Sequence, residues 1–214
     1  IDIILSFASL KASVPSDVEY ANYLFDFILN SPRYHIFEPV KRNDGLEELE
    51  RVCLYQVLLV LSRFLERDLQ KLDVLTTETF IPSLYTEPSP VVRTSIEWLI
   101  SRFTFRLLQS GFTSSLFDKI SNFEESPRIL ASYQKICLMV ARRMRSASID
   151  SWAQYYYDYI LKVIPFASSN RAGIRHFAVS MLCALSNEFN NFNDDQNPVP
   201  SMLKDLLLAV EGVT

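Results

Sequence analysis

The chain has 214 residues, of which 49% are hydrophobic, and its formal net charge is −4. This length and composition suffice for a sizeable buried core, while only four glycines leave little room for phosphate-binding loops or tight β-hairpins. We therefore predict an all-α fold. The sequence has no signal-peptide pattern and no run of about 18 uncharged apolar residues, which argues against a membrane protein and favours an intracellular, cytoplasmic one.

Helices are predicted along the whole chain. SDVE at 16–19 and DGLE at 44–47 resemble capping boxes and start the first two helices. Three longer helices begin at the Ser-Pro pairs 89–90 and 126–127 and after Asn170, because a polar cap, followed by proline in the first two, suits a helix N-terminus. The two helices with capping boxes are predicted over about 16–30 and 44–68. Further helices are predicted over about 71–85, 113–122, 148–165 and 200–211, and an asparagine-rich loop is predicted over 187–200.

The longer helices share one apolar pattern. Counted from Val92, apolar residues fall at offsets of 4, 7, 8, 11 and 15, and the same offsets hold from Ile129 and from Ile174. Counted from Cys53, five of six positions match, and successive starting points are 39, 37 and 45 residues apart. A spacing near 40 residues is typical of stacked helical hairpins. We therefore predict a HEAT/ARM-like α-solenoid of about five hairpins that forms a single domain over residues 1–214.

A helix inside such a stack needs two packed faces. In the helix that begins near residue 90, Trp98 and Phe105 lie seven residues apart on a second stripe, roughly opposite Val92. We predict that one stripe packs against the hairpin partner and that the other packs against a neighbouring repeat.

Residues suited to catalysis or metal binding are scarce. Cys53, Cys137 and Cys183 lie far apart in apolar segments without a CxxC motif, so they are predicted to be reduced core residues. His35 and His176 have no partner at a useful spacing. Nucleotide-binding, metalloprotease and serine-hydrolase motifs do not occur. We therefore predict no catalytic, cofactor-binding or metal-binding residue in this chain.

Positive charge is concentrated in one part of the chain. Residues 126–176 contain eight Lys and Arg against two Asp and Glu, whereas residues 1–90 contain eight against fourteen. Arg128, Lys135 and Arg142 recur every seven residues and so follow one edge of a helix. The candidate nucleic-acid contacts are Arg128, Lys135, Arg142, Arg143, Arg145 and Arg175.

This basic region has two interpretations. It is the solvated face of a helix whose opposite face is apolar, with cations favoured at the helix C-terminus. Alternatively, it is a surface that contacts nucleic-acid phosphates, since cations clustered on neighbouring hairpins are typical of such sites. The net charge of −4 argues against a free-standing nucleic-acid-binding protein.

Two segments carry a family resemblance. VVRTSIEWLI and GIRHFAVSMLCAL resemble second helices of HEAT repeats. Together with YYYDYILKVIPFASSNRAGIRHFAVSMLCAL, they resemble the helical-repeat region that precedes the catalytic domain in eukaryotic SpoU-family tRNA guanosine 2′-O-ribose methyltransferases. The shared features are a helix over 160–165 that ends near proline, a polar turn over 168–172, and the pair Ile174-Arg175. The resemblance covers roughly residues 85–190.

The resemblance implies a scaffold that binds tRNA or positions an adjoining catalytic domain. S-adenosylmethionine is then the cofactor of the parent protein, and the knotted methyltransferase domain that binds it lies outside this chain. The chain begins at Ile1 rather than at Met, so we expect a segment of a longer polypeptide. A HEAT-type adaptor that binds other proteins, through an apolar or acidic surface of residues 1–90, is the alternative.

Overall fold

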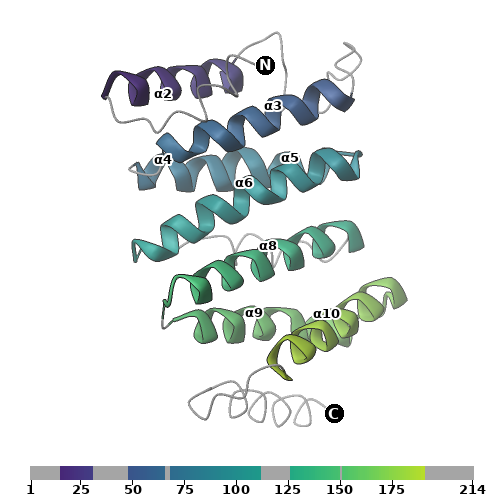
Figure 1. The fold of residues 1–214 in the computed structure, drawn as a ribbon. Coiled ribbons are helices and arrows are strands. Elements are labelled where there is room, and N and C mark those ends of the chain that lie inside the picture. The colour runs from purple at the N-terminus through teal and green to yellow at the C-terminus, as the bar shows by residue number, and fades with distance from the viewer. Residues whose placement is uncertain (1–14, 31–47, 66–67, 112–125, 150, 191–214) are drawn as a thin grey trace. The chain divides into compact units, whose positions relative to one another are not determined.

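The computed structural model describes residues 15–30, 48–65, 68–111, 126–149 and 151–190. Every regular element in these ranges is a helix, as the composition predicted (Figure 1). The helices are α2 (Pro15–Asn30), α3 (Glu48–Leu61), η2 (Ser62–Phe64), α4 (Leu69–Val74), η3 (Leu75–Phe80), α5 (Ile81–Thr86), α6 (Pro90–Gln109), α8 (Pro127–Ser146), α9 (Trp152–Ala167) and α10 (Ala172–Asn190).

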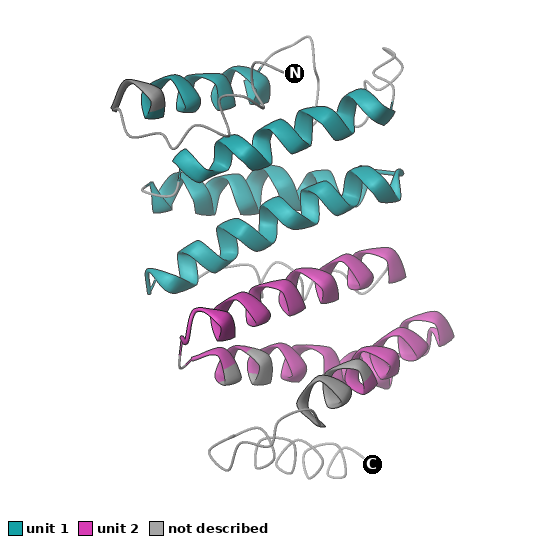
Figure 2. Cartoon of the chain, in the orientation of Figure 1, with its two compact units in different colours: residues 1–116 teal, residues 117–214 magenta. Residues whose placement is uncertain are grey.

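Some predictions fall outside the described residues. These are the helices over 113–122 and 200–211, the DGLE start at 44–47, and His35. The loop expected over 187–200 is wrong in its first four residues, because α10 continues to Asn190. The described chain divides into two compact units, residues 1–116 and residues 117–214 (Figure 2).

In the first unit, α3 lies between α2 and α6 and contacts both helices. The rod formed by α4, η3 and α5 packs against α6 as well. Three fully buried phenylalanines join these elements: the Phe103 ring centroid lies 5.8 Å from that of Phe80 and 6.5 Å from that of Phe25. The core of this unit is therefore centred on α6.

The predicted apolar face of α6 is confirmed. Val92 and all five residues at its offsets, Ile96, Leu99, Ile100, Phe103 and Leu107, are fully buried. The N-terminus also agrees with the prediction, because the Ser89 hydroxyl accepts a hydrogen bond from the Val92 N–H at 3.3 Å. The sequence alone therefore located both this helix and its packed side.

The second packed stripe on α6 is wrong in its position. Trp98 is 42% exposed and Phe105 is half-buried. Burial instead extends from the Val92 face through Glu97, Ser101 and Thr104. Both α3 and the α4–η3–α5 rod contact α6, and the part of a helix that becomes buried depends on where its neighbours cross it.

The helix predicted over 71–85 is a continuous rod with one widened turn. In η3 the backbone is π-helical, and the Ile81 N–H donates to the Thr76 carbonyl five residues earlier. Pro82 follows directly; its ring would clash with the carbonyl four residues before it in a regular α-helix. The wide turn relieves that clash without ending the rod.

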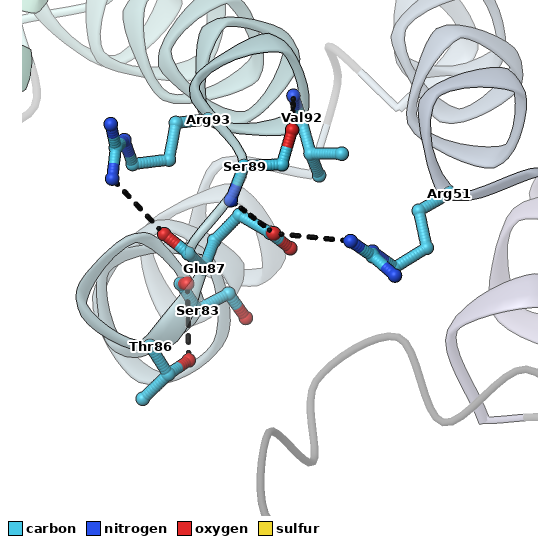
Figure 3. A network of polar contacts seen from close by, with 7 residues as sticks. All are labelled: Arg51, Ser83, Thr86, Glu87, Ser89, Val92 and Arg93. Atoms are coloured by element: carbon cyan, nitrogen blue, oxygen red, sulfur yellow. Dashed lines mark hydrogen bonds and ion pairs between the residues drawn. The ribbon is translucent and has the colours of Figure 1, made fainter. Parts of the chain in front are cut away.

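A polar network ties the corner between α5 and α6 to α3 (Figure 3). The Glu87 side chain is fully buried, and its Oε1 accepts hydrogen bonds from the Ser89 N–H at 3.0 Å and from Arg51 Nη2 of α3 at 3.4 Å. Arg93 Nη1 donates to the Glu87 carbonyl at 3.2 Å. Sequence spacing did not indicate this network, because Arg51 and Glu87 are 36 residues apart.

The described helices of the second unit are α8, α9 and α10, each of which contacts the other two. The apolar face predicted from Ile129 is confirmed, since Tyr133, Ile136, Cys137, Val140 and Met144 are all buried. The face predicted from Ile174 is confirmed at Ala178 and Met181, while Leu182 is half-buried. Leu185 and Phe189 lie among side chains that the structure does not describe.

Two predicted caps differ in detail from the structure. Ser126 occupies the N-cap of α8, but its side chain makes no capping hydrogen bond. In α10 the first helical hydrogen bond runs from the Arg175 N–H to the Arg171 carbonyl at 3.1 Å. Arg171 therefore stands at the N-cap position, one residue after the predicted Asn170.

Candidate nucleic-acid interface

Five of the six candidate contacts lie on α8. Arg128, Lys135, Arg142 and Arg145 are exposed, and Arg143 is half-buried. With about 100° of rotation per residue, Arg128, Lys135 and Arg142 fall on the side of α8 directly opposite its buried face. We call these three residues the basic row. It is the solvent-facing side of an amphipathic helix.

The sixth candidate, Arg175, lies on α10, which contacts α8. It is exposed, and its Nη1 donates a hydrogen bond of 2.7 Å to the Ser169 carbonyl. This bond holds the guanidinium over the turn between α9 and α10. All six predicted residues therefore belong to the second unit, five on α8 and one on α10.

Few negative charges accompany these cations. Among the side chains that the structure describes in this unit, Asp158 is the only carboxylate. It lies exposed on α9 and accepts a hydrogen bond from Gln154 Nε2 at 2.8 Å. The described surface of the unit is thus strongly cationic.

An aromatic and sulfur cluster holds the three helices of this unit together. The Tyr133 and Tyr159 rings meet edge to face at 5.3 Å, and the Tyr159 hydroxyl donates to Met181 Sδ at 3.8 Å. Burial raises the pKa of the Cys137 thiol to about 12, so Cys137 stays protonated at neutral pH. The structure confirms Cys137 as a core residue, whereas Cys53 is half-buried and Cys183 is exposed, contrary to the prediction.

The turn after α8 has an unusual backbone. The Ile149 N–H donates to the Met144 carbonyl and the Ser148 N–H to the Arg145 carbonyl, both at 2.9 Å, which is the pattern of a Schellman cap. Ser148 has a φ of 54° in the left-handed region. At the equivalent place after α6, Gly111 has a φ of 73°. Ser148 therefore occupies a position where glycine is the favoured residue.

Replacement of Ser148 by Gly is expected to stabilise the second unit by about 1 kcal/mol, because an L-residue in the left-handed region carries a penalty of that order. The measurement is a urea unfolding curve followed by fluorescence of Trp152, the tryptophan of this unit. A matched Ser146→Gly change lies at the last helical residue of α8, where the backbone is right-handed and glycine gives no such relief, so it is expected not to stabilise. Equal effects of the two changes would contradict this interpretation.

Trp152 begins α9 and lies beside the same turn. The Arg145 guanidinium carbon is 5.8 Å from the centroid of the Trp152 ring, within the range of a cation–π interaction. This interaction links the C-terminal end of α8 to the start of α9. The sequence pattern did not indicate this contact, because the predicted helix over 148–165 already included Trp152.

His176 lies exposed near the start of α10. Among the residues that the structure describes, no group of three or more His, Cys, Asp and Glu side chains is placed to hold a metal ion. None of the described helices combines the length and hydropathy needed to cross a lipid bilayer.

Comparison with known proteins gives one informative similarity. The chain is 29% identical over 160 residues to a tRNA (guanosine(18)-2′-O)-methyltransferase of Saccharomyces cerevisiae. The matched segment covers 73% of this chain but 11% of that protein. No family model and no solved structure matches the chain. The similarity agrees with the resemblance to SpoU-family tRNA methyltransferases and involves a small part of the relative.

Proposed function

We propose that this chain is a non-catalytic, HEAT-like scaffold within a larger tRNA 2′-O-ribose methyltransferase, where it helps to bind tRNA or to position the catalytic domain. The observation that carries the proposal is the exposed cationic surface of α8, in a chain similar to a tRNA methyltransferase. In this proposal S-adenosylmethionine binds to the catalytic domain, outside the described residues. The protein acts inside the cell, where tRNA is found.

The packing of the helices supports the repeat architecture. In the first unit α3 contacts α6, and in the second α8 contacts α10; these are the helices that share the apolar pattern. The intervening rod or helix packs against the later member of each pair. This is the contact pattern expected of stacked hairpins. We extend it to the whole chain and propose one continuous repeat domain over residues 1–214.

The basic row suits a phosphate backbone. Arg128 and Arg142 are 14 residues apart, so at about 1.5 Å per residue the row is about 21 Å long. Arg143 and Arg145 add two further cations at its C-terminal end. Such a row neutralises several phosphates and displaces their counterions, which gives affinity without sequence specificity. Base recognition is then left to other parts of the parent protein.

Charge reversal at the end of the row tests the proposal. The double variant Arg142→Glu with Arg143→Glu is expected to weaken tRNA binding at least about tenfold and to reduce the slope of log affinity against log salt by about 2, one unit for each lost phosphate contact. The measurement is a filter-binding or anisotropy titration of tRNA at several salt concentrations.

The control for this experiment is charge reversal at an exposed arginine outside the cationic surface. Arg63, in the first unit, is exposed and suits this purpose. Arg63→Glu is compared with Arg142→Glu alone, so that both proteins differ by the same net charge. An unchanged affinity and salt slope in the double variant would refute the assignment of this surface to tRNA.

A protein-binding adaptor is the second candidate, and the surface of α2 favours it. Tyr20, Tyr23 and Phe27 are 52%, 61% and 50% exposed, and the rings of Tyr23 and Phe27 stack at 6.3 Å. Exposed aromatic side chains are enriched at protein interfaces. If neither charge-reversal variant binds tRNA more weakly than the unmodified chain, the protein-binding adaptor is the better explanation.

A further inference from the structure

The turn between α8 and α9 presents an exposed hydroxyl in a strained backbone. Ser148 takes up the left-handed conformation that Gly111 supplies after α6. Its side chain is exposed, and the helical turn beside it ends at Ser146. A serine in a backbone conformation that glycine adopts more easily points to a functional position, since strained residues cluster at such positions.

The residues before Ser148 are those that basophilic protein kinases select. Arg145 precedes it by three residues and Arg143 by five; such kinases bind arginines at these positions in acidic pockets, a charge pattern that sets their specificity. Ser146 also follows an arginine by three residues, but it is helical and its hydroxyl donates to the Arg142 carbonyl at 2.9 Å. The exposed turn thus presents Ser148 as the more accessible acceptor.

We propose that Ser148 is a phosphorylation site for a basophilic serine/threonine kinase. The Ser148 Oγ attacks the γ-phosphorus of Mg²⁺-ATP; the new O–P bond forms as the bond to the β,γ-bridging oxygen breaks. ADP leaves, and the hydroxyl proton passes to the catalytic base of the kinase. No electrons are transferred, and ATP is the only co-substrate.

Entry into a kinase cleft requires an extended acceptor segment. Opening residues 145–149 breaks the capping hydrogen bonds to the Arg143, Met144 and Arg145 carbonyls and moves the half-buried Ile149. Met144, directly before this segment, is buried. Helix ends open at much lower free energy than whole domains, so this local opening exposes the acceptor without unfolding the unit.

The phosphate changes the proposed tRNA surface. A phosphoserine carries a charge of about −1.5 to −2 at pH 7 and forms charge-assisted hydrogen bonds with nearby arginines. A phosphate on Ser148 stands three residues after Arg145 and five after Arg143. We expect it to compete with the Trp152 ring for the Arg145 guanidinium. This regulatory consequence rests on the proposed function: phosphorylation removes cations from the phosphate-binding surface and weakens tRNA binding.

The first experiment incubates the folded chain with Mg²⁺-ATP and the catalytic subunit of a basophilic kinase, such as cAMP-dependent protein kinase. Mass spectrometry is expected to find one phosphate, on Ser148. The Ser148→Gly variant, which suits the left-handed backbone, is expected to lose more than tenfold in rate. Ser151→Ala, in the same turn but without an arginine three residues before it, is expected to retain the full rate. Phosphate on Ser146 instead, or incorporation only after unfolding, would overturn the proposal.

The second experiment compares tRNA binding of the phosphorylated and unmodified chains. The affinity is expected to fall about tenfold on phosphorylation, with a smaller salt slope. An unmodified chain that does not bind tRNA refutes the proposed function, while phosphate on Ser148 still supports the modification site. An unmodified chain that binds tRNA, but whose affinity is unaffected by the phosphate, overturns the regulatory step.

Discussion

Replacing Phe103 with Ala is expected to lower the free energy of unfolding of the first unit by about 3–5 kcal/mol, the range for large cavities in protein cores. The Phe103 ring is fully buried and contacts Phe25 of α2 and Phe80 of η3. Its removal takes away two aromatic contacts and leaves a void where three elements meet. The matched control is Phe105→Ala on the same helix; this half-buried ring is expected to contribute much less.

The two tryptophans of the chain allow each unit to be followed separately. Trp98 lies in the first unit and Trp152 in the second. Urea unfolding of Phe103→Ala is measured in two backgrounds, Trp152→Phe and Trp98→Phe. If the chain is one continuous repeat domain, as proposed, the transition reported by Trp152 is expected to shift with that reported by Trp98. A shift seen only by Trp98 would indicate two independent domains.

Replacing Glu87 with Ala is expected to cost about 3 kcal/mol of stability, because breaking a buried ion pair leaves an uncompensated charge. The change leaves the Arg51 guanidinium, whose side chain is 15% exposed, without this carboxylate. It also removes the acceptor of the buried Ser89 N–H. The measurement is urea unfolding followed by Trp98 fluorescence.

A double-mutant cycle identifies the interaction responsible. Arg51→Met alone is expected to be destabilising, and the variant with both changes is expected to lose at least about 1 kcal/mol less than the sum of the two. The Glu87→Gln variant preserves the shape and an acceptor oxygen for Ser89, so it separates the charge from the hydrogen bond. Strict additivity of the Arg51 and Glu87 changes would show that the ion pair contributes nothing to stability.

The buried faces of single helices were predictable from the sequence. On α6 and α8 all the residues at the offsets counted from Val92 and from Ile129 are buried. A helix repeats every 3.6 residues, so a side chain on the core side must be apolar or paired. The basic row was predictable for the same reason, as the opposite face of α8. The seven-residue spacing of Lys135 and Arg142 from Arg128 was sufficient to assign all three to that face.

Features that depend on a second helix were not predictable in this way. Trp98 was predicted to lie on a packed stripe of α6, yet it is 42% exposed, while Glu97 is 1% exposed. Which flank of a helix becomes buried depends on where its neighbours cross it, and periodicity carries no information about crossing directions. The same limit applies to Cys183, which belongs to an apolar segment but is exposed on α10.

The amino-acid sequence by itself determined the helical class, the helix starts at Ser89 and Ser126, and the division of each long helix into an apolar and a charged side. These are local properties, set by backbone propensity, capping and the helical repeat. Only the tertiary structure decided the Arg51–Glu87 pair, the Arg145–Trp152 contact and the left-handed Ser148 between α8 and α9. Each depends on where one helix stops and another crosses it, which is settled when side chains from distant segments pack together.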